Sequence, residues 1–262
     1  MTAEATLSSD NFADEWRRWH NQRQITVSSP GGDLTLTGTH WISDGTVVED
    51  VPGRWSVENG VVRVSDAEGL TVDGEPVTEA VIRDGQWLAV GEVALVIIRR
   101  GDDTAVRTYD PHSEAVRSFD GIDAFAPDPA WVVTADFRPA KVDTTEHIVH
   151  TNSGREVDYQ VIGTFSFAVD GHEVEMVGLD TGHVGEAHLT FRDATSGKQS
   201  YAASRFLFVP LPTGPGPVTL DFNRVELPPC AFSDAFICPL PPRQNILPFP
   251  VEAGERQLRV AP

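Results

Sequence analysis

The feature that most constrains the fold is a succession of short apolar segments separated by turn residues. From residue 33 onward, runs of aliphatic and β-branched residues are interrupted by turns such as Glu58-Asn59-Gly60 and Arg83-Asp84-Gly85. Strand-length runs that recur at intervals of roughly 8–12 residues are typical of β-sandwiches and β-barrels. We therefore predict a mostly β chain.

The predicted strands form two sets on either side of a connector at residues 120–130, which is rich in Asp, Ala and Pro. The first set comprises Arg54–Val57, Val61–Val64, Leu70–Val72, Val77–Ile82, Trp87–Val90, Val93–Arg99 and Ala105–Tyr109. The second set comprises Trp131–Arg138, Glu146–Thr151, Gly163–Val169, His172–Met176, His188–Arg192, Gln199–Val209 and Val218–Arg224.

Both ends of the chain depart from this pattern. Residues 10–24 predict one helix, because Phe12, Trp16, Trp19 and Arg23 recur at helical spacing. Residues 226–250, called the arm below, hold seven prolines. Proline cannot donate to a β-ladder, so the arm is predicted to wrap around the second set of strands as an irregular segment.

The charge balance restricts the partners that we expect. The 262 residues include 39 acidic and 20 basic side chains, for a net charge of −19. Such a surface repels nucleic-acid phosphates and anionic lipid headgroups, so we expect neither nucleic acid nor a membrane as a partner. The first residues lack the basic and apolar parts of a signal peptide, and the longest apolar run, Val93–Ile98, is too short to span a bilayer. We expect a cytoplasmic protein.

A group of segments in the second half carries a recognisable pattern. It comprises Phe191–Gly197, Tyr201, Arg205–Leu207, Leu220–Arg224, Pro228–Phe232, Cys238–Pro242, Asn245 and Ala253–Glu255, and Trp16, Arg23, Ser29-Pro30 and Leu36–Trp41 extend it toward the N-terminus. This pattern resembles the DUF1684 family, a set of prokaryotic proteins with no established function. The resemblance implies a fold but no reaction.

A second pattern lies in the first half, at Val72–Val77, Leu88–Gly91 and Leu95–Ile97. It is similar to the second half of a forkhead-associated (FHA) sandwich, in which loop Arg, Ser and Asn side chains bind phosphothreonine. Here Arg54 and Ser56 are not followed by the expected His, and Asp73 stands where the FHA fold has Asn. The resemblance therefore implies FHA-like topology without phosphopeptide binding.

These patterns together predict three parts. Residues 1–30 form the helix and a lead-in, and residues 31–125 form an FHA-like β-sandwich. Residues 126–262 form a second antiparallel β-barrel or sandwich, which carries the DUF1684-like pattern and the proline-rich C-terminal arm.

The candidate site lies in the third part. Side chains alternate between the two faces of a strand, so the polar residues of three neighbouring strands could share one sheet surface. Several arginines in the less acidic half of the chain favour binding of a carboxylate or phosphate on a small anionic ligand. The candidate ligand-binding residues are Arg192, Tyr201, Arg205, Asp221, Asn223, Arg224 and Asn245.

Two other interpretations of these residues stay open. The same cleft could be the active site of an enzyme, with Asp221 as general base and Tyr201 as proton donor. Alternatively, the residues form a structural Arg–Asp network that ties the arm to the sheet, since a buried arginine needs partners whatever the function.

The two cysteines, Cys230 and Cys238, lie on the arm and are predicted to be structural. They could be buried thiols, a disulfide that closes a short loop, or a reactive pair, which their spacing favours least.

No metal or cofactor is expected. His147 and His150 would point to opposite faces of a strand, and the common nucleotide-binding, hydrolase and zinc-protease motifs are absent.

Overall fold

The computed structural model describes residues 9–151, 155–169 and 171–261. The chain is mostly β, with one long N-terminal helix and several antiparallel sheets. It divides into two compact units, of which unit 1 comprises Met1–Gln24 and Asp120–Pro262 and unit 2 comprises Ile25–Phe119. Within the described ranges, no helix has both the length and the apolar character needed to cross a membrane.

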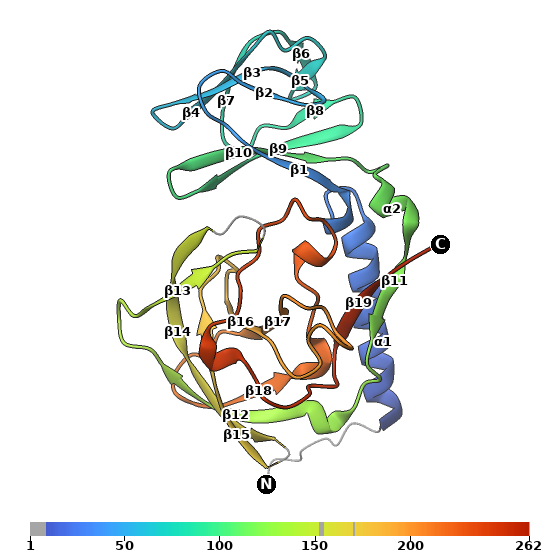
Figure 1. Ribbon diagram of the computed structural model, residues 1–262, viewed down its shortest axis with the longest axis vertical. Helices are drawn as coiled ribbons and strands as arrows, with labels where there is room; N and C mark the ends of the chain where they lie inside the picture. Colours follow the sequence, from blue (N-terminus) through green and yellow to red (C-terminus); the bar gives the residue numbers. More distant parts are fainter. Residues whose placement is uncertain (1–8, 152–154, 170, 262) are drawn as a thin grey trace. The chain divides into compact units, whose positions relative to one another are not determined.

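Unit 2 contains two antiparallel sheets, a six-stranded sheet in the order β1-β10-β9-β8-β5-β6 and a four-stranded sheet in the order β2-β3-β4-β7 (Figure 1). Residues of both sheets, including Trp55 and Leu88, share one apolar core. The FHA-like topology stays a prediction. The strands are β1 Leu36–Trp41, β2 Thr46–Val48, β3 Val51–Glu58, β4 Val61–Ser65, β5 Leu70–Val72, β6 Glu75–Val77, β7 Ala80–Ile82, β8 Leu88–Val90, β9 Val93–Arg100 and β10 Asp103–Tyr109, and η1 Asp33–Thr35 and α2 Glu114–Ser118 flank them.

The tight hairpins of unit 2 follow from its turn residues. Asn59 and Gly60 connect β3 to β4, and Asp73 and Gly74 connect β5 to β6, all four with positive φ. Two-residue turns of this kind match the twist of the flanking strands and require two left-handed residues, which Asn, Asp and Gly adopt at least cost.

Unit 1 is built on a seven-stranded antiparallel sheet in the order β17-β16-β15-β14-β12-β18, with β13 paired to the long strand β14. Helix α1 (Ser9–Ser28) lies beside a second, two-stranded sheet of β11 and β19 (Figure 1). The strands are β11 Phe119–Ala124, β12 Val132–Pro139, β13 Thr145–Val149, β14 Glu156–Val169, β15 His172–Leu179, β16 Glu186–Phe191, β17 Arg205–Pro210, β18 Gly216–Asp221 and β19 Glu255–Val260. The single-turn 3-10 helices are η2 Pro129–Trp131, η3 Phe222–Arg224, η4 Pro229–Ala231 and η5 Arg243–Asn245.

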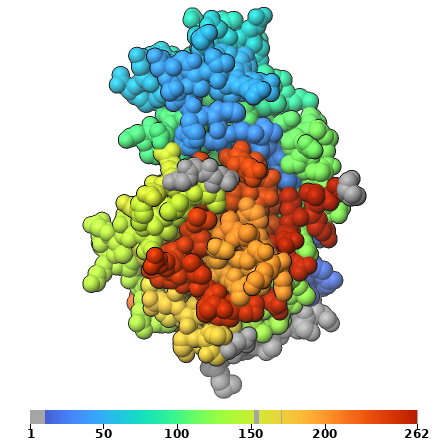
Figure 2. Space-filling view, viewed as in Figure 1, coloured from blue at the N-terminus to red at the C-terminus, as the bar shows by residue number. Residues whose placement is uncertain are grey.

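The arm completes the core of unit 1. Leu247 and Phe249 join an apolar cluster that also contains Phe165 of β14 and Leu207 of β17. The backbone of the arm pairs with the segment after β16. Arg192 N–H donates to the Asn245 carbonyl, and Leu247 N–H donates to the Arg192 carbonyl. In Figure 2 the orange and red segments after residue 200 cover one face of this unit. Proline has no backbone N–H, so the arm has fewer backbone donors than an ordinary strand. Side-chain hydrogen bonds therefore hold the arm together with backbone hydrogen bonds.

Candidate functional site

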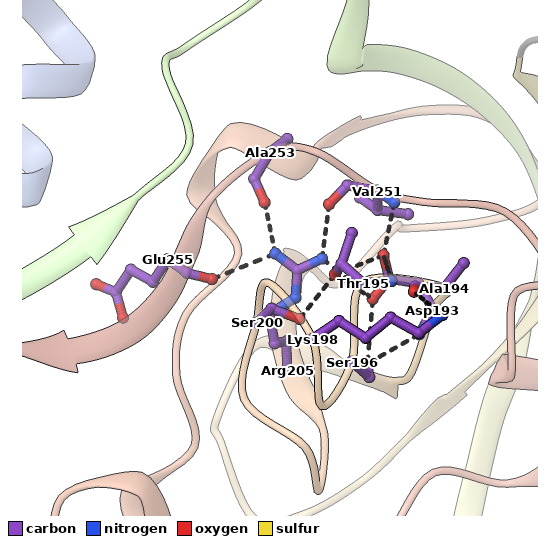
Figure 3. A network of polar contacts seen from close by, with 10 residues as sticks. All are labelled: Asp193, Ala194, Thr195, Ser196, Lys198, Ser200, Arg205, Val251, Ala253 and Glu255. Atoms are coloured by element: carbon purple, nitrogen blue, oxygen red, sulfur yellow. Dashed lines mark hydrogen bonds and ion pairs between the residues drawn. The ribbon is translucent and has the colours of Figure 1, made fainter.

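The predicted arginine site is centred on Arg205, the first residue of β17, whose side chain is 0% exposed. Its Nη1 donates to the carbonyl of Ala253 at 2.7 Å and to that of Glu255 at 3.2 Å, and Nη2 donates to the carbonyl of Val251 at 2.7 Å. Figure 3 shows the guanidinium pointing at these carbonyls. Arg205 therefore binds the chain segment that follows the arm, which leaves no face of its guanidinium for a ligand.

Asp193 supplies the countercharge for Arg205. Its Oδ1 lies 3.4 Å from Arg205 Nη2, and both side chains are fully buried. Asp193 also accepts hydrogen bonds from Val251 N–H at 2.6 Å and from the Thr195 hydroxyl at 2.9 Å. Burial lowers the pKa of Arg205, and the Asp193 carboxylate opposes this effect. The charges of the pair are balanced internally, and Nε is the one guanidinium nitrogen of Arg205 without a hydrogen-bond partner in the described part of the chain.

A glycine brings the carbonyls of this network together. Gly254 has φ +74°, and a Cβ there would lie 2.6 Å from Val225 Cβ and 2.7 Å from the Val225 carbonyl oxygen. Only glycine fits such a close approach in the left-handed region. The turn at Gly254 allows the carbonyls on either side of it, those of Ala253 and Glu255, to reach the same Nη1.

Two further candidates, Asn223 and Asn245, are also 0% exposed. The Asn245 amide accepts from Val177 N–H at 2.7 Å and donates to the carbonyls of Val177 and Thr190 at 2.9 Å each, so it ties η5 to β15 and β16. The Asn223 amide makes reciprocal bonds with the backbone of Asp128, at 2.8 and 2.9 Å. Both side chains satisfy buried backbone groups and have no surface to offer to a ligand.

The strands around the site are shorter than predicted. Strand β16 ends at Phe191, β17 begins at Arg205 and β18 ends at Asp221, so Arg192, Tyr201, Asn223 and Arg224 lie outside strands. The reason at β18 is local. The Asp221 carboxylate accepts from Asn223 N–H at 3.0 Å and so starts the 3-10 turn η3. The alternation of faces along a strand therefore does not apply to these residues.

The remaining candidates are spread over different places. The Arg192 side chain is exposed. The Tyr201 hydroxyl donates to the Cys230 carbonyl at 2.9 Å, so this side chain contacts the arm. Asp221 and Arg224 form an ion pair at 3.2 Å and are partly exposed, at 23% and 43%. Of the predicted set, Asp221 and Arg224 are brought together where a ligand could reach them.

Asp221 and Arg224 line a groove of about 360 Å³ in unit 1. The helix α1 supplies aromatic walls, and Trp16 is fixed in place because its Nε1 donates to the Asn223 carbonyl at 2.8 Å. The Arg224 guanidinium lies 5.8 Å from the centre of the Trp19 ring, which favours a cation–π contact. The lining residues are Phe12, Glu15, Trp16, Pro129, Val132, Thr219, Asp221 and Arg224.

In unit 2, Arg54 and Ser56 were singled out by comparison with the FHA phosphate site. They lie on strand β3, where Arg54 is opposite Ser65 and Ser56 is opposite Arg63 on β4. Carboxylates accompany both arginines, with Asp66 at 3.7 Å from Arg54 and Glu58 at 3.9 Å from Arg63. Because each arginine has a nearby countercharge, this face has little excess positive charge.

Cys230 and Cys238 are reduced thiols, each 3% exposed. Cys230 N–H donates to Cys238 Sγ at 3.3 Å, which places the two residues in direct contact. A hydrogen bond from the Cys238 thiol lowers the pKa of Cys230 to about 7, against the effect of burial, and the hydroxyls of Tyr201 and Thr151 act in the same direction.

Among the residues that the structure describes, no group of three or more His, Cys, Asp or Glu side chains could hold a metal ion. His147 is bonded to Asp158 at 2.7 Å, whereas His150 is bonded to Tyr159 at 2.8 Å.

The network that holds the arm lies within a segment shared with other proteins. A family model described as a protein of unknown function, DUF1684, matches residues 117–256, which is more than half of the chain. The chain belongs to the DUF1684 family. The match begins just before β11 and ends at the second residue of β19, so it includes Asp193, Arg205, Gly254 and both cysteines.

A solved structure is similar to part of this DUF1684 protein. It is the solution NMR structure of an uncharacterized protein of Haloarcula marismortui, 36% identical in sequence, with a TM-score of 0.44. The similarity covers 53% of this chain and 77% of that one. A search of curated proteins found no match.

Besides Asp193, sequence reasoning missed a second buried acid of the DUF1684 segment, Glu255. Its side chain is 0% exposed and pairs with Arg23 of α1, with Nε to Oε1 at 3.0 Å and Nη2 to Oε2 at 3.2 Å. It also accepts from Leu227 N–H at 2.8 Å. Arg23 and Glu255 both belonged to the recognised pattern, but they are 232 residues apart, and only the fold pairs them.

Proposed function

We propose that unit 1 of this DUF1684 protein binds a small molecule in the groove between α1, β18 and η3, with Arg224 as its charged anchor. The observation that carries this proposal is the accessible Asp221–Arg224 pair in a groove with aromatic walls. Ligand sites are typically concave and mostly apolar, with a few well-placed polar groups. The groove combines these features.

The charges of the groove define the class of ligand. Arg224 uses Nε for Asp221, so its terminal nitrogens can bind a carboxylate or phosphate. Two carboxylates, those of Glu15 and Asp221, line the same groove and would repel a second anionic group. The ligand we propose therefore has one acidic group for Arg224, a flat apolar part for Trp16, and a neutral or cationic remainder near the two carboxylates.

The buried residues of the family pattern support this groove indirectly. Asn223 lies between Asp221 and Arg224 in the chain, and its bonds to the backbone of Asp128 hold η3 next to η2. Asp221 Oδ1 accepts from the Asn223 side chain at 3.0 Å, while its Oδ2 accepts from Arg224 Nε at 3.2 Å. A ligand would therefore meet a preformed ion pair, which reduces the ordering cost of binding.

The geometry favours binding over catalysis. An enzyme that uses Asp221 as base and Tyr201 as donor needs both groups at one substrate. Tyr201 is not among the groove residues, and its hydroxyl is bonded to the Cys230 carbonyl. We therefore propose a binding role for Asp221 and Arg224, and a structural role in anchoring the segment 251–255 for Arg205 and Asp193.

The proposal predicts a specific effect of Arg224→Gln. Small carboxylates, phosphates and zwitterions would be screened against the full chain by ligand-observed NMR, and affinities measured by calorimetry. Any compound that binds the groove should bind Arg224→Gln about 10- to 100-fold more weakly, because a charge-assisted hydrogen bond is lost. The fold should be unaffected, since the lost ion pair is partly exposed.

Arg138→Gln is the matched control. Arg138 forms an ion pair of the same kind, with Nε 3.1 Å from Asp136 Oδ2 on β12, but it does not line the groove. Binding should be unchanged in this variant. Equal affinity of wild type and Arg224→Gln for every compound that binds, or the absence of binding across the panel, would contradict the proposal.

A further inference from the structure

The arm brings two thiols together at a place where it is fixed to the sheet. Cys230 N–H donates to Cys238 Sγ at 3.3 Å, so the Cys238 sulfur lies directly against the backbone of Cys230. Cys238 is held by Thr151, because Cys238 N–H donates to the Thr151 hydroxyl at 3.0 Å and Thr151 N–H donates to the Cys238 carbonyl at 2.8 Å. The two cysteines are therefore in direct contact on a segment that backbone and side-chain hydrogen bonds hold in place.

The surroundings of Cys230 favour its reactive form. The thiolate is the nucleophile in sulfur chemistry, and donors around the sulfur stabilise it. Three neighbours lower the pKa of the Cys230 thiol, namely the Cys238 thiol and the hydroxyls of Tyr201 and Thr151, and the Tyr201 hydroxyl donates its hydrogen to the Cys230 carbonyl. Their combined effect lowers the pKa of Cys230 to about 7, with burial as the opposing influence. Burial raises the pKa of the Tyr201 phenol, and the two cysteines and the negative charge of Asp234 act in the same direction.

This arrangement differs from that expected of two inert core cysteines. A purely apolar environment raises the pKa of a thiol, whereas here a neighbouring thiol and two nearby hydroxyls lower the pKa of Cys230. The second thiol is also in the position of a resolving cysteine, which protects the first from irreversible oxidation. Both residues are 3% exposed, so a reagent that reaches them in the folded protein must be small.

We propose that Cys230 and Cys238 form a site of reversible oxidation by hydrogen peroxide, with Cys230 as the attacking sulfur and Cys238 as the resolving sulfur. The Cys230 thiolate attacks one peroxide oxygen and breaks the O–O bond, so that Cys230 becomes a sulfenic acid and the other oxygen leaves, with a proton, as water. The Cys238 sulfur then attacks the sulfenic sulfur, forms the S–S bond and releases a second water. In total one peroxide and two thiols yield one disulfide and two waters, and a dithiol reductant reverses the change.

Oxidation would lock the arm. The disulfide would link Cys230 of η4 to Cys238. Cys238 lies two residues before Leu240, whose N–H donates to the Val149 carbonyl of β13. A disulfide that closes a short loop restricts the unfolded chain and so raises the midpoint of thermal unfolding. For a chain of this size we expect a rise of several degrees on oxidation.

The test uses the folded full chain treated with hydrogen peroxide and analysed by intact-mass and peptide mass spectrometry. Wild type should lose two hydrogens, yield a linked Cys230–Cys238 peptide, and recover both thiols with dithiothreitol. Cys238→Ser should stop at a sulfenic acid that dimedone traps, and Cys230→Ser should react at least 10-fold more slowly. The wild-type rate should rise with pH up to about 7 and then level off, because it follows the thiolate fraction of Cys230.

Tyr201→Phe is the matched control for the thiolate. It retains the aromatic ring but removes the hydroxyl, so the pH at which the rate levels off should move upward while the product stays the same. The proposal is overturned if wild type forms the disulfide only when urea unfolds it. It is equally overturned if Cys230→Ser reacts as fast as Cys238→Ser.

Discussion

Replacement of Arg205 by Ala is expected to lower the free energy of unfolding of unit 1 by about 3–5 kcal/mol, because it leaves the buried Asp193 carboxylate without its countercharge. The carbonyls of Val251, Ala253 and Glu255 would lose their donors as well. The effect should appear in urea denaturation of the full chain, and as faster hydrogen exchange in the amides of β16 and β17.

Two further variants show whether the loss of unfolding free energy comes from the buried ion pair of Arg205 and Asp193. Arg138→Ala removes an exposed arginine whose partner is also exposed, and should cost less than about 1 kcal/mol. The double variant Arg205→Ala with Asp193→Ala should be less destabilised than the sum of the two single variants, because the two side chains interact directly. A loss in Arg205→Ala no larger than in Arg138→Ala would sink the structural role that we assign to Arg205.

Acidification from pH 7 to 5 is expected to destabilise unit 1 by about 2 kcal/mol through His188 alone, on the linkage between pKa and stability. Burial, with a smaller contribution from the charge of His183, lowers the pKa of His188 to about 3. His188 is 2% exposed, and its ring contacts the rings of Phe206 and Phe208, at centroid distances of 4.2 and 4.6 Å.

The direction of this effect follows from which state binds the proton. In the folded protein His188 stays neutral down to about pH 3, whereas in the unfolded chain it is protonated below the ordinary histidine pKa of 6.5. Between these values the unfolded state binds more protons, so stability falls as the pH falls. The measurement is the urea unfolding free energy at pH 7 and at pH 5 for wild type and His188→Gln.

His188→Gln should be less acid-sensitive than wild type, because glutamine does not titrate. His147→Gln is the control of opposite sign. His147 is exposed, and hydrogen bonds to Asp158 and Glu156 raise its pKa, so its contribution to stability is present at low pH and lost as the pH rises. An unchanged difference between pH 7 and pH 5 in His188→Gln would refute the assignment.

Much of the local structure could be predicted from neighbouring residues. The turn at Asn59-Gly60, the helix that contains Trp16, and the irregular path of the proline-rich arm were all predicted. Each depends on interactions within a few residues: left-handed backbone conformations, helical spacing of side chains, and the missing N–H of proline. The short strands could be located because they too depend on interactions between residues close in sequence.

The ends of the strands around the candidate site were less predictable. The prediction extended β17 back to Gln199 and β18 forward to Arg224, but the structure begins β17 at Arg205 and ends β18 at Asp221. At both places polar side chains compete with the ladder for backbone bonds. Asp221 caps η3, and Thr195 and Asp193 stabilise the loop before β17.

The sequence alone was enough to single out the Arg, Asp and Asn residues of the site. In a β-rich segment such polar side chains either pair with one another inside the protein or are exposed to a ligand. Which of these holds for each residue was decided by contacts between distant segments. Arg205 is buried because residues 251–255 close over it, and Arg224 is accessible because η3 meets α1, more than 200 residues earlier, at a groove rather than a closed interface. Residue spacing determines turns and faces over a few positions, whereas burial depends on which distant strands pair and in what register, and that information is spread over the whole core.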